Sequence, residues 1–145
     1  MFDFLGQYEH SIDEKGRLTI PSDYRGDLSD GLVVTRGKQR HLNVFPLERW
    51  KALVEDFEGI PVYTWHRPAN LRRLVLAHAV KTIPDGHGRV RLPDHLREFA
   101  QIDDQVILAG VGGHIELWAP ALWKEQLEEL DSISNEEMQD DLLRI

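Results

Sequence analysis

An internal repeat constrains this chain more than any other feature of its sequence. The stretch DEKGRLTIP at residues 13–21 returns as DGHGRVRLP at residues 85–93, an offset of 72 positions. Each copy has an aspartate, a glycine three positions later, an arginine directly after it, an alternating run and a closing proline. A unit of roughly 45 residues cannot bury an adequate core by itself. The two copies are therefore expected to fold together.

The match continues past this stretch after a single inserted residue. At an offset of 73, His41 falls on His114 and Trp50 falls on Trp123. The aligned segments are GLVVTRG with DQVILAG and HLNVFPLERW with HIELWAPALW. A match this ordered at a nearly fixed offset indicates an internal duplication.

Each copy is predicted to run strand, strand, short helix, strand, strand, helix. Period-two alternation predicts the strands, and a proline followed by helical spacing predicts the helices. In the first copy the elements are QYEHS, RLTI, SDYRGDL, LVVTR, HLNVF and PLERWKALVEDF. In the second copy they are LAHAVK, RVRL, DHLREFA, QVILA, HIELW and PALWKEQLEEL. Ser22 and Asp94 are the expected N-caps of the short helices.

These elements predict an α+β fold that is mainly β. We expect the strands of the two copies to interleave into one barrel with approximate twofold symmetry and flanking helices, because one face of each alternating strand can line a shared interior. The expected organisation is a first repeat at 7–54, a connector at 55–76, a second repeat at 77–123 and an acidic C-terminal helix or tail at 124–145. Within the connector, ANLRRLVLA is typical of a helix. The tail is either a helix capped by Ser134 or frayed chain.

Charge is distributed unevenly along the chain. The net charge is −8, but residues 1–97 hold 15 Lys and Arg against 13 Asp and Glu, whereas residues 98–145 hold 2 against 12. Eleven of the 12 arginines precede residue 98. The overall acidity is thus a property of the C-terminal third and does not exclude nucleic acid as a ligand.

Several protein classes are disfavoured by what the sequence lacks. There is no cysteine, which rules out disulfides and thiolate metal sites. No apolar run approaches the roughly 18 residues that span a membrane, and the N-terminus does not resemble a secretory signal. The seven histidines are scattered without metal-ligand spacing, and no nucleotide-binding or nucleophile motif occurs. We expect a cytoplasmic protein that is not an enzyme and needs no cofactor or metal.

The repeated turn has its own chemistry. Gly16 and Gly88 can adopt a positive φ at little cost, and an aspartate that opens a turn can accept backbone N–H bonds. The following arginine can fold back onto that aspartate as a local ion pair, or project outward as a planar, permanently charged donor. Spacing alone leaves both readings of the arginine open.

Together these motifs resemble the MraZ family of bacterial DNA-binding transcriptional regulators. The resemblance covers about residues 1–125 and rests on YEHSIDEKGRLTIPSDYR, GLVVTRG, PLERW, the second D-x-x-x-R turn and VGGHIELW. It implies two AbrB-like swapped-hairpin halves in one chain, and assembly of chains into rings. It also implies binding to direct repeats in double-stranded DNA, upstream of the division and cell-wall gene cluster, and hence association with the nucleoid.

The resemblance further assigns residues to the DNA contact. The implied DNA-binding residues are Lys15, Gly16, Arg17, His87, Gly88 and Arg89, and the implied turn-stabilising residues are Asp13 and Asp85. His87 stands where the first copy has Lys15. Neutral histidine is a weaker phosphate contact than lysine near pH 7. The two turns are therefore expected to be unequal.

Two further interpretations stay open at this point. AbrB-like barrels also occur in antitoxins, so an alternative function is a protein-interaction module that acts through the acidic tail. The connector also holds a second basic cluster, made of His66, Arg67, Arg72 and Arg73. Three explanations are open for it: a solvated helix face, a subunit contact or an auxiliary phosphate contact. The recurrent aromatic pairs, Phe45 with Trp118 and Trp50 with Trp123, are expected to anchor the core or a subunit interface.

Overall fold

The computed structural model describes residues 2–59, 66–133, 137 and 139. Antiparallel strands and five helices alternate along this part of the chain. In the first copy they are β1 (Gln7–Ser11), β2 (Arg17–Thr19), α1 (Ser22–Leu28), β3 (Leu32–Arg36), β4 (Leu42–Pro46) and α2 (Leu47–Glu58). The connecting helix is α3 (His66–Leu76), and the second copy holds β5 (Val80–Thr82), β6 (Arg89–Arg91), α4 (Asp94–Ala100), β7 (Gln105–Gly110), β8 (Ile115–Trp118) and α5 (Pro120–Asp131).

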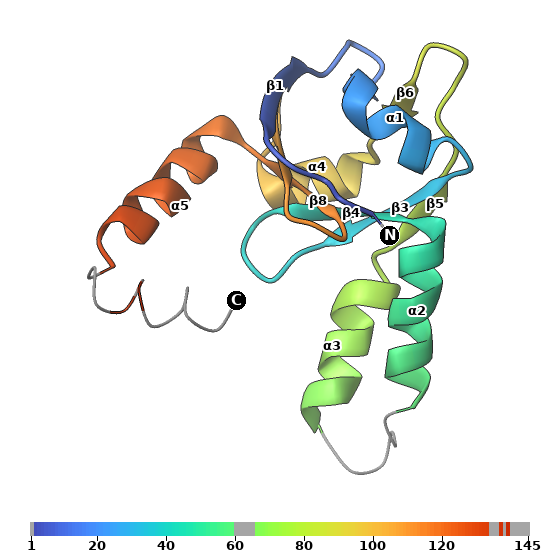
Figure 1. Cartoon of the computed structure of the whole chain (residues 1–145), viewed down its shortest axis with the longest axis vertical. Coiled ribbons are helices and arrows are strands. Elements are labelled where there is room, and N and C mark those ends of the chain that lie inside the picture. Colours follow the sequence, from blue (N-terminus) through green and yellow to red (C-terminus); the bar gives the residue numbers. More distant parts are fainter. Residues whose placement is uncertain (1, 60–65, 134–136, 138, 140–145) are drawn as a thin grey trace.

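The strands of the two copies share one sheet. Its order is β1-β7-β8-β4-β3-β5, and every neighbouring pair is antiparallel. The first strand of each copy thus pairs with a hairpin of the other copy, β1 with β7 and β5 with β3. The remaining strands, β2 and β6, form a separate two-stranded ribbon, which lies at the end of the molecule opposite the α2–α3 hairpin (Figure 1). The α+β class with mainly antiparallel strands is confirmed.

The sheet does not close into the expected barrel. Within the described chain, β1 and β5 are edge strands of the six-stranded sheet and are not paired with each other. The physical reason lies in the turns that follow them. Each edge strand runs into a tight turn and then into a ribbon strand, and the two ribbon strands pair with one another instead of extending the sheet.

Twofold symmetry is visible at the two places where equivalent strands meet. In the ribbon, Leu18 lies opposite Val90, its equivalent at an offset of 72. In the sheet, Asn43 lies opposite Glu116, its equivalent at an offset of 73. An antiparallel pair that places equivalent residues opposite each other has a local twofold axis between them. The β2–β6 pair and the β4–β8 pair thus both relate the first copy to the second by an approximate twofold rotation.

The core lies between the sheet, the ribbon and the short helices α1 and α4. Alternation in RLTI buries Leu18 and Ile20 while Arg17 and Thr19 stay half-exposed, and RVRL repeats the pattern with Val90 and Leu92. The strands β3, β4, β7 and β8 and the helices α1 and α4 contribute further side chains that are almost wholly buried. Among these are Leu32, Val34, Leu42, Leu96, Val106, Leu108, Ile115 and Leu117.

Helices α1 and α4 match SDYRGDL and DHLREFA residue for residue. The prediction that Ser22 and Asp94 cap them is wrong, because the preceding Pro21 and Pro93 occupy the N-cap position. Both prolines have the extended backbone that an N-cap requires, with φ near −55° and ψ near 143°. Neither helix has a side-chain cap hydrogen bond. The rigid proline sets the start of the helix without one.

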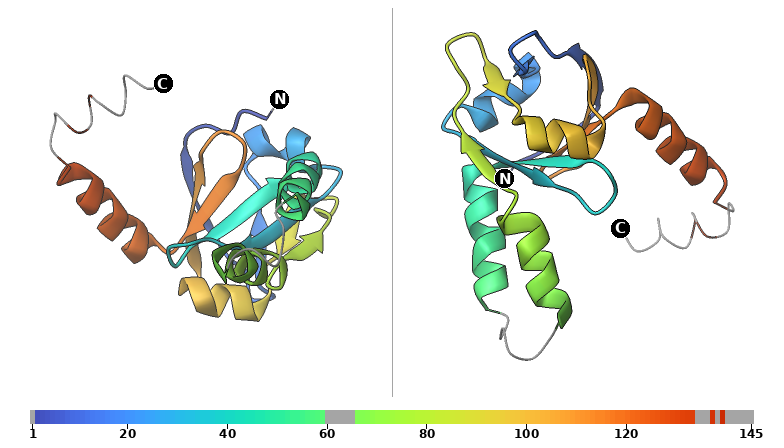
Figure 2. Two further views of the ribbon diagram at one scale, coloured as in Figure 1. Left: turned by 90° about the horizontal axis from the view of Figure 1, so that it is seen from below. Right: turned by 180° about the vertical axis from the view of Figure 1, so that it is seen from behind.

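The connector forms a longer helix than predicted. Because α3 runs on to Leu76, the strand expected at LAHAVK begins only at Val80. Helices α2 and α3 lie side by side as a hairpin that projects from the sheet (Figures 1 and 2). Arg72 donates to the carbonyl of Phe57 on α2, so it is a contact within the hairpin rather than part of a solvated face. The side chains of His66 and Arg67 lie outside the described residues.

The C-terminal helix α5 projects from one side of the sheet and ends at Asp131 (Figures 1 and 2). It is drawn in orange, apart from the α2–α3 hairpin (Figures 1 and 2). Ser134, the expected cap of a further helix, lies outside the described residues. Among the helices that the structure describes, none is long and apolar enough to cross a membrane.

Replacement of Gly110 by alanine is expected to destabilise the fold. A Cβ there would stand 2.5 Å from the carbonyl carbon of Phe4 and 2.6 Å from the amide nitrogen of Leu5. These are backbone atoms that cannot rotate away, so we expect a loss of about 1–3 kcal/mol of unfolding free energy. The control is Gly26→Ala, where a Cβ meets nothing within 4 Å. In helix α1 this change is expected to stabilise by about 0.5–1 kcal/mol. Urea unfolding measures both, and equal effects would contradict the packing described for Gly110.

Candidate nucleic-acid interface

The first repeated turn is closed by its own aspartate. Oδ1 of Asp13 accepts hydrogen bonds from the backbone N–H groups of Lys15 at 2.9 Å and Arg17 at 2.8 Å. The backbone adds Gly16 N–H to Asp13 C=O at 2.9 Å and Asp13 N–H to Arg17 C=O at 3.0 Å. Gly16 has φ of 76°, a left-handed conformation that favours glycine. One carboxylate and one glycine therefore fix the shape of the loop.

The second turn repeats this geometry. Oδ1 of Asp85 accepts from the backbone N–H groups of His87 and Arg89, both at 2.9 Å, and Gly88 has φ of 75°. The loop backbone does not depend on whether the third residue is lysine or histidine. The side chains of Lys15 and His87 are exposed at the two turns. The two copies thus present the same backbone frame with different side chains, a lysine in the first and a histidine in the second.

The turn arginines combine the two roles that the sequence left open. Nε of Arg17 donates to Oδ2 of Asp13 at 2.7 Å, and Nε of Arg89 donates to Oδ2 of Asp85 at 2.9 Å. Both arginine side chains remain 30% exposed. Among the described residues, their Nη groups make no hydrogen bond or ion pair. The ion pair therefore orients each guanidinium by one edge and leaves its Nη donors available to a ligand. As exposed ion pairs, these contacts add little to stability.

The two turns are attached to the same ribbon, because each turn leads directly into one of its two strands, β2 or β6. Because Leu18 and Val90 face the core, the alternate positions of β2 and β6 lie on the outer side. Arg17 lies directly opposite Arg91, and Thr19 lies opposite Arg89. The turns precede Arg17 and Arg89, at opposite ends of a ribbon that is three residues long. A two-stranded ribbon of this kind fits the major groove of B-form DNA.

Each turn is also held by the other copy. The backbone N–H of Ile20 donates to Gly88 C=O at 2.8 Å, and that of Leu92 donates to Gly16 C=O at 2.9 Å. The two turns are therefore positioned relative to each other by backbone hydrogen bonds as well as by the core beneath the ribbon.

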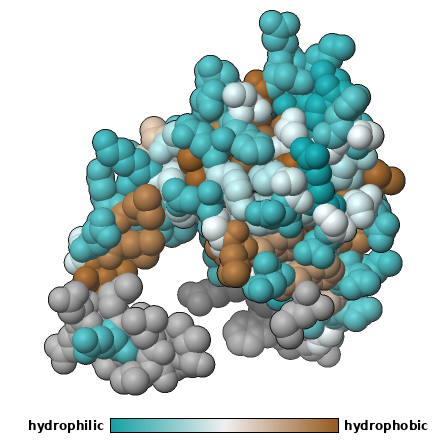
Figure 3. Space-filling model, turned by 45° about the horizontal axis from the view of Figure 1, so that its top comes forward, coloured by the Kyte–Doolittle hydropathy of each residue, from teal (hydrophilic) through white to brown (hydrophobic). Residues whose placement is uncertain are grey.

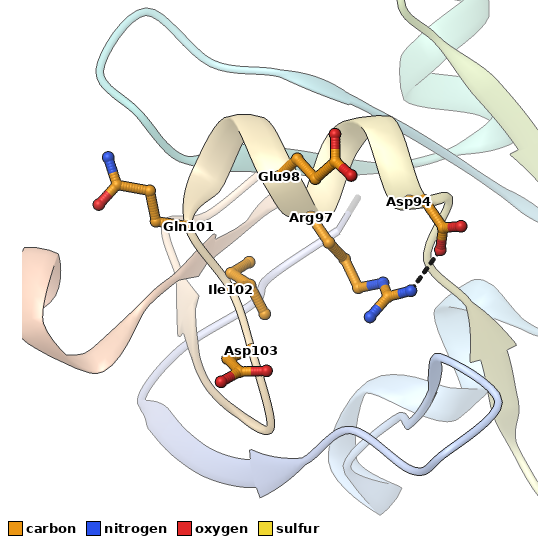
Figure 4. Close-up of a pocket in the computed structure, with 6 residues that line it drawn as sticks. All are labelled: Asp94, Arg97, Glu98, Gln101, Ile102 and Asp103. Atoms are coloured by element: carbon orange, nitrogen blue, oxygen red, sulfur yellow. Dashed lines mark hydrogen bonds and ion pairs between the residues drawn. The ribbon is translucent and has the colours of Figure 1, made fainter.

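Arginines of the short helices pack beneath the turns. Arg97 donates Nε to Leu92 C=O at 3.2 Å, and its Nη2 would stand 3.1 Å from a Cβ on Gly16. It also pairs with Asp94, beside a hollow bounded by Glu98, Gln101, Ile102 and Asp103 (Figure 4). A Cβ at position 16 would therefore crowd the Arg97 guanidinium, in addition to straining the left-handed φ of this residue.

The equivalent arginine of the first copy has fewer partners. Arg25 donates Nε to Ile20 C=O at 2.8 Å, and the same Nε would stand 2.6 Å from a Cβ on Gly88. The residue equivalent to Asp94 is Ser22. Among the described residues, Arg25 makes no ion pair. The contact of Arg25 and Arg97 with the turn of the other copy depends on how the copies interleave, so spacing along the sequence does not predict it.

A further set of repeated residues lies away from the ribbon. His41 stacks on Trp118 with ring centroids 4.6 Å apart, and its equivalent His114 stacks on Phe45 at 5.0 Å. Each histidine thus packs on the aromatic residue of the other copy. His41 is buried, with Nδ1 2.6 Å from Gln39 C=O and Nε2 3.2 Å from Oε2 of Glu116. In the described part of the chain, no group of three or more metal-ligating side chains comes together.

The hydrogen bonds of the turns depress the pKa values of both aspartates. The pKa of Asp85 is lowered to about 2, chiefly by the hydrogen bond from the backbone N–H of Arg89, which outweighs the opposing desolvation. The pKa of Asp13 is lowered as well, chiefly by the backbone N–H of Arg17. A carboxyl with a depressed folded-state pKa stabilises the fold above its unfolded value of about 3.9. That contribution is lost as the pH falls through the folded-state value.

Titration of Asp85 is expected to have a midpoint of about 2, measured from its carboxyl ¹³C chemical shift. Arg89→Ala removes the side-chain bond but keeps the backbone N–H, so we expect the midpoint to rise yet stay below about 3.9. Arg91→Ala removes an equal charge from the same ribbon without removing a bond to Asp85, and is the control. A full return to about 3.9 in Arg89→Ala would contradict the dominance of the backbone bond.

The sequence of this chain matches a known protein family. The family model described as "MraZ protein, putative antitoxin-like" matches residues 4–65 and 75–144. The chain is 40% identical to a protein named transcriptional regulator MraZ from Roseiflexus sp. (strain RS-1), over 89% of this chain and 90% of that protein. Proteins of the same name from Herpetosiphon aurantiacus and Caldanaerobacter subterraneus are 41% and 38% identical, over 86% and 95% of this chain and 87% and 95% of theirs. The chain belongs to the MraZ family.

Proposed function

We propose that this chain is a sequence-specific DNA-binding transcriptional regulator that reads direct repeats upstream of the division and cell-wall gene cluster. The observation that carries the proposal is the pair of aspartate-anchored arginine turns at the two ends of one ribbon. Relatives about 40% identical over most of the chain are named transcriptional regulators. In this proposal the protein acts in the cytoplasm, on the nucleoid.

Base recognition falls to the turn arginines. Arg17 and Arg89 are each held through Nε by their aspartates, which leaves the Nη donors to meet a ligand. An arginine fork matches O6 and N7 of guanine in the major groove, and such a bidentate contact discriminates against a wrong base by about 1–3 kcal/mol. The anchoring ion pair fixes the direction of the fork in advance. Less rotamer entropy is then lost on binding.

Phosphate contacts come from the rest of the turns. Lys15 and the backbone near Gly16 flank Arg17, and such groups position a protein on the duplex without reading its sequence. At the second turn, His87 and Gly88 occupy these places beside Arg89. Since the Lys15 ammonium is a stronger phosphate contact than the His87 imidazole, the first turn binds the more strongly of the two.

Self-assembly into a ring is part of the same proposal. One chain offers few contacts, whereas several chains on neighbouring repeats multiply weak affinities. Helix α5 supports an interface between copies, because it has no buried residue and exposes Leu127 by 39% and Leu130 by 42%. Hydrophobic side chains, drawn in brown, gather along this helix (Figure 3). The interleaved strands likewise support the swapped-hairpin architecture, with an approximate twofold axis through the ribbon.

A second candidate function is that of an antitoxin-like module, which the description of the matching family favours. In that case the acidic tail binds a partner protein. The two proposals are distinguished by the gene neighbourhood: an adjacent toxin gene supports the antitoxin, and adjacent methyltransferase and cell-wall genes support the regulator of that cluster.

Arg17→Ala is expected to abolish the preference for the protein's own upstream DNA over a scrambled duplex of equal length. The physical reason is the loss of the oriented guanidinium that meets guanine. Fluorescence anisotropy over a salt series measures both duplexes, and wild type should show a steep negative slope of log affinity against log salt. Lys51→Ala removes one charge from helix α2, at the other end of the molecule, and is the control. Equal preference in wild type and Arg17→Ala would refute a reading role for this turn.

Polar replacement of the exposed leucines is expected to reduce assembly. The double variant Leu127→Ser, Leu130→Ser removes the apolar surface of α5 without touching a buried side chain. Sedimentation velocity should give smaller particles than wild type, with unchanged circular dichroism. Ile83→Ser, which alters a side chain that is 67% exposed elsewhere on the molecule, is the control. An unchanged sedimentation coefficient in the double variant would exclude α5 from the interface between copies.

A further inference from the structure

The two copies differ in charge beside the ribbon, although their backbones correspond. Arg91 of the second copy is equivalent to Thr19 of the first, and Lys81 is equivalent to Glu9. The second copy therefore has two cations where the first has a neutral residue and an anion. A fold requirement would apply to both copies alike. The difference calls for an explanation other than the architecture of the repeat.

Arg91 stands in an unfavourable place for a purely structural residue. It lies directly opposite Arg17 across the ribbon. The adjacent bond from Leu92 N–H to Gly16 C=O makes this a non-hydrogen-bonded pair, in which side chains approach most closely. Like charges directly opposite each other destabilise a sheet. Threonine at the equivalent position of the first copy avoids this cost.

Arg91 and Lys81 line one hollow between the ribbon and strand β5. The other residues of its lining are Val80, Thr82, Pro93 and Asp94. Asp94 is already engaged by Arg97. Both cations are exposed, and among the described residues neither makes an ion pair. The hollow thus combines two unneutralised cations, with Arg17 across the ribbon from one of them.

These observations identify the ligand by its chemistry. Two adjacent cations that do not neutralise any described carboxylate fit an anion, and an anion would also relieve the repulsion between Arg91 and Arg17. Arg17 is anchored by its aspartate and so suits the strict geometry of a base edge. Arg91 and Lys81 have no such anchor in the described chain. They suit a backbone phosphate, which needs charge more than a fixed direction.

We propose that Arg91 and Lys81 form a binding site for a DNA backbone phosphate next to the base-reading Arg17. The inference rests on the proposed DNA-binding function and adds two contacts to it. The site supplies affinity and register, whereas sequence preference stays with the turn arginines. It also makes the first turn the stronger half of the interface, because the equivalent positions of the first copy hold Glu9 and Thr19, which would not attract a phosphate.

The test uses Arg91→Thr and Lys81→Thr in the full-length protein, with Lys51→Ala on helix α2 as the control that removes the same charge elsewhere. Threonine at position 91 reproduces the residue of the first copy, so the fold accommodates it. Anisotropy over a salt series is measured with the upstream duplex and with a scrambled duplex of equal length. Each variant is expected to lose affinity for both duplexes by the same factor. Each should also flatten the slope of log affinity against log salt by about 1.

A second readout separates a binding role from a structural one. Thermal unfolding without DNA at low salt should show Arg91→Thr at least as stable as wild type, because the repulsion with Arg17 is removed. Arg91→Lys keeps the charge and should keep the wild-type salt slope. Lower stability of Arg91→Thr together with normal binding would overturn the proposal and make Arg91 structural.

The remaining outcomes distinguish this inference from the function on which it rests. If Arg17→Ala loses sequence preference while Arg91→Thr and Lys81→Thr bind like Lys51→Ala, the phosphate site is refuted and the DNA-reading turn is retained. If wild type shows no preference for the upstream duplex and no salt dependence, the proposed function and this inference both fail.

Discussion

The antiparallel pairing of β2 with β6 is the constraint on which the rest of the structure depends. It places Leu18 opposite its own equivalent Val90, which joins the two copies about a local twofold axis. Both side chains point into the core, so the outer side of the same ribbon must carry the alternating polar residues. Burial of the core and display of the arginines are therefore consequences of one set of backbone hydrogen bonds.

Much of the fold could be predicted from the sequence because its signals are local. Alternation in RLTI and RVRL and the prolines before the helices determine strands and helix starts within a few residues. Local signals did not predict that the sheet stays open, or that the strand expected at LAHAVK begins only at Val80. Both depend on tertiary competition: the ribbon strands pair with each other, and α3 extends over the beginning of that segment because it packs against α2 and β3.

The candidate site also combines local features that the sequence predicts with tertiary contacts that it does not. The aspartate, glycine and arginine of each turn contact one another within five residues, so their chemistry can be anticipated from spacing. Arg91 comes next to Arg17 only through the register of two strands that lie 72 residues apart. Arg97 likewise meets Gly16 only once the copies interleave. Periodicity predicts that these side chains are exposed but carries no information on which residues become their neighbours.

The central claim is that the turn arginines read guanine in the major groove. It is tested most directly by replacing single guanines of the upstream repeat with 7-deazaguanine, which lacks the N7 acceptor but keeps Watson–Crick pairing. The account predicts that wild type binds less tightly when the guanine contacted by either turn arginine is substituted. For Arg17→Ala, substitution of the guanine that Arg17 contacts should no longer change the affinity. Uniform binding by wild type to every substituted duplex would contradict base reading by the turns.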